Sequence, residues 1–182
     1  MEKTLTSKIA DKNNLQSNWE DIVMTNDTVL SGALRIVNLP EMRVAYCNIV
    51  SAAPEDEALG KVLEWAEKEK LMGTARIFGF NTTQFTPESK TYGWAASVSI
   101  PENVELPDYL EEKRFPGGLY ASLNSTNEVY DSWQTLMRLL KEHDEYDVDK
   151  NRPCLEEHIA SGEPKGSDND FYLTLLEPVF RK

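Results

Sequence analysis

Two adjacent carboxylates and a histidine stand together in the segment "RPCLEEHI", residues 152–159. Glu156 and Glu157 precede His158, which is one of only two histidines in the chain. The short apolar frame of this segment predicts a strand, in which neighbouring side chains point to opposite faces. Glu156 and His158 therefore share one face and Glu157 takes the other, so the two carboxylates are not expected to act as a pair.

This separation argues against a metal centre, which needs three or four converging ligands. Neither His143 nor His158 has a second histidine at helical or hairpin spacing. The loop 147–151 starts with EF-hand spacing, but Arg152 replaces the required glycine and His158 the closing glutamate. A nucleophile pair of Cys154 and His158 would be about 13 Å apart along one strand. The sequence also lacks a phosphate-binding loop, so we predict neither a metal nor a cofactor.

Nearby aromatic residues suggest a role for Glu156 alone. In the strand that begins at Tyr92, alternation places Tyr92 and Trp94 on one face. If Leu155 and Ile159 pack against helices, Glu156 points to the other face of the sheet, into an aromatic groove. A carboxylate there would attract an organic cation, or with a raised pKa act as a general acid or base. The alternative is a strand glutamate that faces water.

Two copies of a strand–helix–strand–strand unit are expected to position these residues. The first copy has strands on both sides of Pro40, a helix between Ser51 and Gly73, and further strands at 75–80 and 92–100. The same order recurs, with a strand at 117–124, a helix at 125–143 and strands at 154–159 and 171–180. The apolar stripes of the two helices are offset by about 74 residues, as in Leu59 and Trp133.

We therefore predict an α+β domain over residues 33–182, with repeats at about 33–104 and 115–180. Both copies would form one antiparallel sheet with both helices on one face. The helix-free face would line a ligand groove on the pseudo-two-fold axis, since grooves between repeats are favoured ligand sites. Residues 101–118 would cross the surface between the copies. Residues 1–32 would form an N-terminal arm, in which the spacing of Leu15, Trp19 and Ile22 allows a short helix.

The composition indicates a soluble globular protein. Of 182 residues, 40% are hydrophobic and 27% are charged, and the net charge is −12. Such a negative field repels phosphate backbones, which argues against direct nucleic-acid binding. Because no apolar run reaches the ~18 residues of a membrane helix and no secretory pattern opens the chain, we expect a cytoplasmic protein. Its cysteines, Cys47 and Cys154, would then be reduced, buried and unreactive.

Six motifs in order resemble the GyrI-like family: "LPEMRVAY", "FGFN", "YGW…VSIPE", "FPGGLYA", "CLEEHI" and "LTLLEPV". That family includes the effector-binding domains of AraC-type and MerR-type transcription regulators. The resemblance spans about residues 34–179 and implies a central groove for bulky, often cationic or aromatic, small molecules. It also implies that Glu156 is the acidic residue of the groove. The sequence departs from the family at Ala95, where many stand-alone members carry an acid, and at Ala96 and Ser97, where bulky residues often follow.

Three functions follow from the residues and the resemblance. The first is a small-molecule-binding protein that acts as a sensor or sequesters its ligand, since no helix-turn-helix is visible before Leu34. The second, implied by some stand-alone relatives, is a hydrolase of cyclopropane-bearing genotoxins, in which Glu156 acts on water with Tyr92 or His158. The third is an inhibitor that binds DNA gyrase through an acidic surface. The predicted ligand-contacting residues are Glu156, Trp94, Tyr92, Tyr46, Phe80, Tyr120, His158 and Tyr172.

Overall fold

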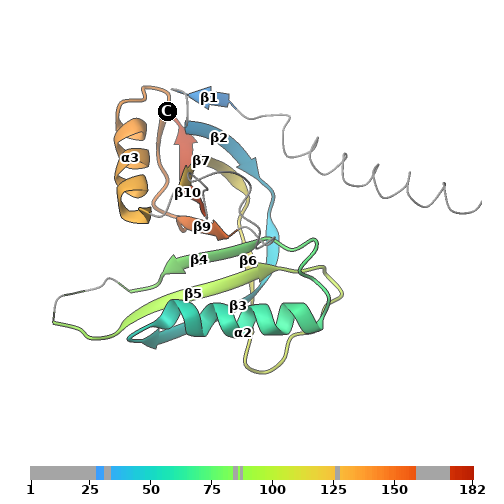
Figure 1. The fold of residues 1–182 in the computed structure, drawn as a ribbon. Coiled ribbons are helices and arrows are strands. Elements are labelled where there is room, and N and C mark those ends of the chain that lie inside the picture. The colour runs from blue at the N-terminus through green and yellow to red at the C-terminus, as the bar shows by residue number, and fades with distance from the viewer. Residues whose placement is uncertain (1–27, 31–33, 84–85, 87, 126–127, 159–172) are drawn as a thin grey trace, which may run out of the picture.

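The computed structural model describes residues 28–30, 34–83, 86, 88–125, 128–158 and 173–182. These residues form two helices and ten strands (Figure 1). The predicted N-terminal arm and its short helix lie outside the described residues, except for the first strand. In chain order the elements are β1 (Thr28–Leu30), β2 (Leu34–Leu39), β3 (Met42–Ser51), α2 (Pro54–Lys68), β4 (Ile77–Asn81), β5 (Tyr92–Ser99), β6 (Glu111–Phe115), β7 (Gly118–Ser125), α3 (Val129–Lys141), β8 (Tyr146–Val148), β9 (Leu155–His158) and β10 (Leu173–Arg181).

The strands join in one antiparallel sheet, in the order β1-β2-β7-β10-β9-β4-β5-β3-β6, with β8 paired to β10. Two halves, β6-β3-β5-β4 and β9-β10-β7-β2, meet where β4 pairs with β9. The halves are equivalent in strand order, which confirms the predicted duplicated unit and places the pseudo-two-fold axis at the β4–β9 junction. The outer strand of each half comes from the segment that precedes the other half. β2 precedes the half that starts with β3 but pairs with β7, and β6 precedes the half that starts with β7 but pairs with β3.

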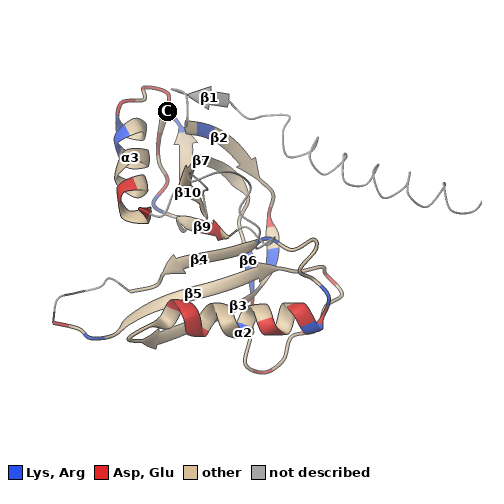
Figure 2. Ribbon diagram, viewed as in Figure 1, with Lys and Arg blue, Asp and Glu red and all other residues tan. Residues whose placement is uncertain are grey.

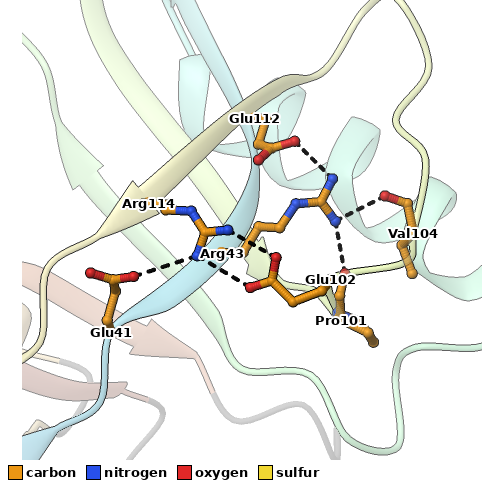
Figure 3. A network of polar contacts seen from close by, with 7 residues as sticks. All are labelled: Glu41, Arg43, Pro101, Glu102, Val104, Glu112 and Arg114. Carbon is orange, nitrogen blue, oxygen red and sulfur yellow. Dashed lines mark hydrogen bonds and ion pairs between the residues drawn. The ribbon is translucent and has the colours of Figure 1, made fainter.

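Strand β6 was not predicted, and it lies inside the segment expected to cross the surface. Most of its side chains are charged and exposed, so it lacks the apolar alternation that predicts a strand. Arginines hold it in place (Figure 3). Arg43 on β3 donates to Glu112 on β6 at 2.7 Å and to two backbone carbonyls of residues 101 and 104. Arg114 on β6 binds Glu102 through two hydrogen bonds.

Both helices pack on the same face of the sheet, as predicted. The apolar stripe of α2 covers Ala45 and Ala96 of β3 and β5, and that of α3 covers Ala121 and Leu175 of β7 and β10. The strands between these two packed regions, β4 and β9, lie between the helices (Figure 1). Neither α2 nor α3, the helices of the described part of the chain, has the length and apolarity needed to cross a membrane.

The helix-free face is also buried, which the sequence did not indicate. One apolar cluster there joins Val44 of β3, Tyr120 of β7 and Leu155 of β9. Because β3 and β7 are far apart in the strand order, the sheet must curve around this cluster to bring them together. This corrects two predictions: in the described part of the chain the helix-free face is filled by this cluster instead of lining the groove, and Leu155 packs away from the helices. The remaining buried members of the cluster are Leu39, Phe78, Phe115 and Leu176.

Arg152, at the start of "RPCLEEHI", connects the segment before β9 to the neighbouring strands. Its guanidinium donates to the backbone carbonyls of Leu119 and Val179 at 3.0 and 2.9 Å. It also lies over the ring of Tyr120, 4.8 Å from the centroid. A nearly buried, planar cation is suited to satisfying several carbonyls at once. Arg152 therefore sets where β9 begins and how it lies beside β10.

Candidate functional site

The helix-facing side chains of β9 form the floor of the candidate site. Glu156 lies opposite Gly79 of β4 and Leu175 of β10, and Leu175 packs in the cluster beneath α3. His158 lies opposite Ile77, which packs in the cluster beneath α2. The predicted shared face of Glu156 and His158 is therefore confirmed. The face itself is the one that carries the helices, and the two side chains lie between α2 and α3.

Trp133 of α3 contacts Glu156 directly. Its indole Nε1–H donates to Oε1 of Glu156 at 3.0 Å, and both side chains are half-buried. Burial raises the pKa of Glu156, the Trp133 hydrogen bond opposes that rise, and the negative charge of Glu55 adds to it. No described lysine or arginine forms an ion pair with Glu156. The site thus holds a partly desolvated carboxylate with a single neutral donor.

A second carboxylate reaches the site from α2. Glu55 in the first turn of α2 accepts a hydrogen bond from the Tyr92 phenol at 2.5 Å. This bond and burial raise the pKa of Tyr92 to about 12, so Tyr92 stays a neutral donor near neutral pH. Tyr92 and Trp94 share one face, as predicted from alternation, and that face is the one that carries the helices. Glu55, which holds Tyr92, therefore acts on Glu156 from the α2 side, while Trp133 contacts it from the α3 side.

Trp94 supports the floor and is hardly exposed. Only 3% of its surface is accessible, and its ring passes over Gly79, where an added Cβ would lie 2.0 Å from Cζ2. The ring then meets His158 edge-on, with centroids 6.1 Å apart and an interplanar angle of 89°. Burial lowers the pKa of His158, which keeps the imidazole neutral. Its Nε2 atom is buried and has no hydrogen-bond partner among the described residues.

A third carboxylate, Glu177 of β10, lies on the same face two residues beyond Leu175. Burial raises its pKa to about 7. Cys154, which precedes β9 and alternates with Glu156, has its pKa raised to about 11, first by desolvation from the protein atoms around its thiol and then by the charges of Glu177 and Glu156. Cys47 is buried as predicted, but Cys154 is exposed, which corrects that prediction. Its thiol is protonated near neutral pH and is a weak nucleophile.

The two helices present equivalent side chains on either side of this floor. Leu59 and Leu63 of α2 are half-buried against the first apolar cluster. At the same offset of 74 residues, α3 presents Trp133 and Met137, and Met137 remains 40% exposed. Tyr130, one turn before Trp133, is 75% exposed. The α3 wall is thus the more aromatic and the more accessible of the two.

Three predicted aromatic residues lie on the opposite face of the sheet from Glu156. Tyr46 and Phe80 pack against each other, with ring centroids 6.1 Å apart, and Lys113 lies over the Tyr46 ring. Tyr120 is 1% exposed inside the cluster of the helix-free face. These three residues cannot line the same surface as Glu156, because the sheet separates them from it. The eighth predicted residue, Tyr172, lies outside the described residues.

Glu157 lies on the opposite face of β9 from Glu156, which confirms the predicted alternation of side chains along this strand. Its carboxylate accepts two hydrogen bonds from the Arg76 guanidinium, at 2.6 and 2.7 Å, on the helix-free face. Ala95 also lies on that face, opposite Phe80, and is fully buried. An acid at this position, which the GyrI-like resemblance associates with many members, would point away from Glu156 here.

Sequence reasoning missed Trp133, Glu55 and Glu177 as site residues. Trp133 belongs to the apolar stripe of α3, and Glu55 is one of three acidic residues in the first turn of α2, so neither position by itself indicates a ligand site. The one available signal was the 74-residue offset, which matches Trp133 to Leu59. It shows an aromatic side chain on α3 where the equivalent position of α2 has an aliphatic side chain. In the described ranges, no three His, Cys, Asp or Glu side chains are grouped so that they could hold a metal ion.

The chain matches one known protein family over most of its length. The sequence pattern of the family described as "Cass2: Integron-associated effector binding protein" matches residues 35–179. The chain belongs to this family. The family is described as effector-binding, so membership implies that the chain binds a small molecule. The predicted GyrI-like relationship is confirmed. No curated protein matches the chain.

Solved structures show the same fold at low sequence identity. A hydrolase from Listeria innocua is 11% identical, with a TM-score of 0.62 over 91% of this chain and 98% of that one. A second hydrolase from the same organism is 12% identical, with a TM-score of 0.59 over 81% and 92% of the two chains. The EcmrR C-terminal domain is 12% identical, with a TM-score of 0.58 over 82% and 98%. At these identities the likeness establishes the fold alone.

Proposed function

We propose that the chain binds bulky aromatic or cationic small molecules between α2 and α3, and that it acts as a sensor or sequestering domain. The observation that carries the proposal is Glu156, a half-buried carboxylate whose described partner is the neutral Trp133 N–H. A carboxylate without a counter-charge in a partly desolvated place is costly to ionise. A cationic ligand offsets this cost, and an aromatic ligand also gains contact with the Trp133 ring.

The direction of the pKa of Glu156 supports the same conclusion. Burial and the Glu55 charge hold its pKa above the ordinary value, so the protein alone disfavours the charged form. A bound cation would favour that form and lower the pKa again. Binding of a cation is therefore coupled to release of a proton from this face of the sheet.

The test is a titration of tryptophan fluorescence and heat release with tetraphenylphosphonium, an aromatic monocation. We expect saturable binding, and Glu156→Gln should weaken it about tenfold or more, since hydrogen bonds and contacts to a charged group contribute ~1.5–3 kcal/mol. Glu157→Gln is the matched control, because it removes the same group from the adjacent residue on the opposite face. Equal affinities of Glu156→Gln and the wild type would refute the assignment, provided that circular dichroism shows both to be folded.

A second candidate function is hydrolysis, favoured by the raised pKa of Glu156. A carboxyl group with a raised pKa can donate a proton to a leaving group and, once ionised, accept one from water. Incubation with a cyclopropyl-pyrroloindole compound, followed by product analysis, tests this reaction. Product formation that disappears in Glu156→Gln would support catalysis, and no product above the buffer rate would exclude it for this substrate class. No feature of the site favours the gyrase hypothesis, and we do not propose it.

A further inference from the structure

The candidate site contains more carboxyl groups than one monovalent cation can neutralise. Glu156 and Glu177 both face the helices, and Glu55 lies close enough to Glu156 to raise its pKa. None of these three forms an ion pair with a described lysine or arginine. Elsewhere ion pairs are frequent, and Glu157, one residue from Glu156, is held by Arg76 at 2.6 Å. Figure 2 shows that acidic residues also lie on α2 and α3 beside this part of the sheet.

Glu156 and Glu177 stand on adjacent strands at a definite spacing. Glu156 is directly opposite Leu175, so Glu177 is its diagonal neighbour on the same face. Diagonal neighbours in an antiparallel sheet are about 7–8 Å apart. Cys154 lies near both, since each carboxylate raises the pKa of its thiol. An ion pair requires atoms within about 4 Å. Neither carboxylate changes the pKa of the other, so the two groups stand apart, and two cationic groups on one rigid spacer suit them better than one ammonium group.

We propose that the site selects ligands with two cationic groups about 7–8 Å apart, Glu156 binding one group and Glu177 the other. The inference rests on the proposed function, because it names the ligand class of the same site. The chemical class is a bis-ammonium or bis-amidinium compound with an aromatic spacer, which would lie against Trp133. Two observations besides the acidic residues point to a ligand: the chain belongs to an effector-binding family, and the buried Nε2 atom of His158 has no described partner.

Two probes that differ by one charge test this selection. They are para-xylylene-bis(trimethylammonium), with two cationic groups on one ring, and para-methylbenzyltrimethylammonium, with one. Titrations are made at about pH 8, above the pKa of about 7 of Glu177, where its carboxylate is ionised. We expect the bis-cation to bind at least about tenfold more tightly to the wild type, as a second charge pair of ~1.4 kcal/mol would give.

The variants assign the two charges. Glu177→Gln should weaken the bis-cation far more than the monocation, so that the advantage of the bis-cation falls to about twofold or less. Glu156→Gln should weaken both probes. Glu142→Gln, at the exposed end of α3, is the control for net charge and should change neither affinity. Glu177→Gln removes a group that is costly to ionise, so it is expected to fold.

The outcomes separate this inference from the function on which it rests. Equal affinities of the two probes for the wild type, both lowered by Glu156→Gln, would overturn the selection of dications and leave cation binding intact. An advantage of the bis-cation that survives in Glu177→Gln would also overturn it. If neither probe binds while tetraphenylphosphonium does, the dication inference fails alone. If none of the three cations binds, both proposals fail.

Discussion

Replacing Glu177 with glutamine should stabilise the protein in a pH-dependent way. Burial raises the pKa of Glu177 from its ordinary 4.5 to about 7. A carboxyl group with a raised folded-state pKa contributes its full stability below the unfolded pKa and loses it as pH rises through the folded pKa. At about pH 4.5 the carboxyl group is protonated in most folded molecules, so little stability is lost. Above about pH 7 the glutamate is ionised and destabilises the folded protein. Glutamine has a similar shape and remains neutral throughout.

The size of the effect follows from the same two pKa values. At about 1.4 kcal/mol for each tenfold change in proton affinity, the difference between 4.5 and about 7 amounts to at most about 3 kcal/mol at pH 8. Screening of the partly exposed side chain lowers this figure. At about pH 4.5 the same relation predicts well under 1 kcal/mol. For a chain of this size, each kcal/mol shifts the melting temperature by about 2–4 °C.

This effect is measured by urea and thermal unfolding at the two pH values named above. The proteins compared are the wild type, Glu177→Gln and Glu142→Gln. Glu142→Gln corrects for the loss of one negative charge from a chain with a net charge of −12. We expect Glu177→Gln to exceed both proteins in stability at about pH 8 and to match them at about pH 4.5. A gain of equal size at both pH values, or a loss at about pH 8, would refute the assignment of Glu177 as a desolvated carboxylate.

Two further predictions concern the floor of the site. Gly79→Ala should lower the free energy of unfolding by about 1–3 kcal/mol, as overpacking does, because the new Cβ would lie 2.0 Å from the Trp94 ring; denaturant unfolding measures this, and an unchanged midpoint would contradict it. Trp133→Phe removes the N–H that lowers the pKa of Glu156, so that pKa should rise further. The variant should then bind tetraphenylphosphonium more weakly, and the loss should shrink as the pH rises and Glu156 ionises. Fluorescence titrations over a series of pH values measure this, and a loss of equal size at every pH would show that only packing was removed.

Much of the fold could be predicted because its signals are local. The 3.6-residue stripes of the helices and their offset of 74 residues identify two copies of one unit. Pairing of those copies into one sheet follows from the need to cover each helix. β6 escaped prediction because an edge strand exposed to water carries charges instead of an apolar face. Its position depends on Arg43, which binds groups about sixty residues away in sequence.

The sides of the candidate site could be predicted only in part. Alternation along "CLEEHI" correctly separates Glu156 from Glu157, since a strand has a period of two whatever surrounds it. Alternation does not say which face carries the helices. Leu155 is apolar, and an apolar residue normally marks the helix-covered face. Here the curved sheet buries its other face as well, around Tyr120 and Val44, so the apolar side of β9 was assigned to the wrong layer.

The sequence by itself determined the class of fold, the repeat, and the fact that Glu156 and His158 share a face, because each depends on the period of a local element. Only the tertiary structure decided what that face meets. The pairing of β9 with β4 and β10 places Glu156 between two helices, brings Trp133 to it and sets Glu177 diagonally beside it. These contacts join residues from separate parts of the chain, and desolvation, which raises the pKa of both carboxylates, arises only when those parts pack together.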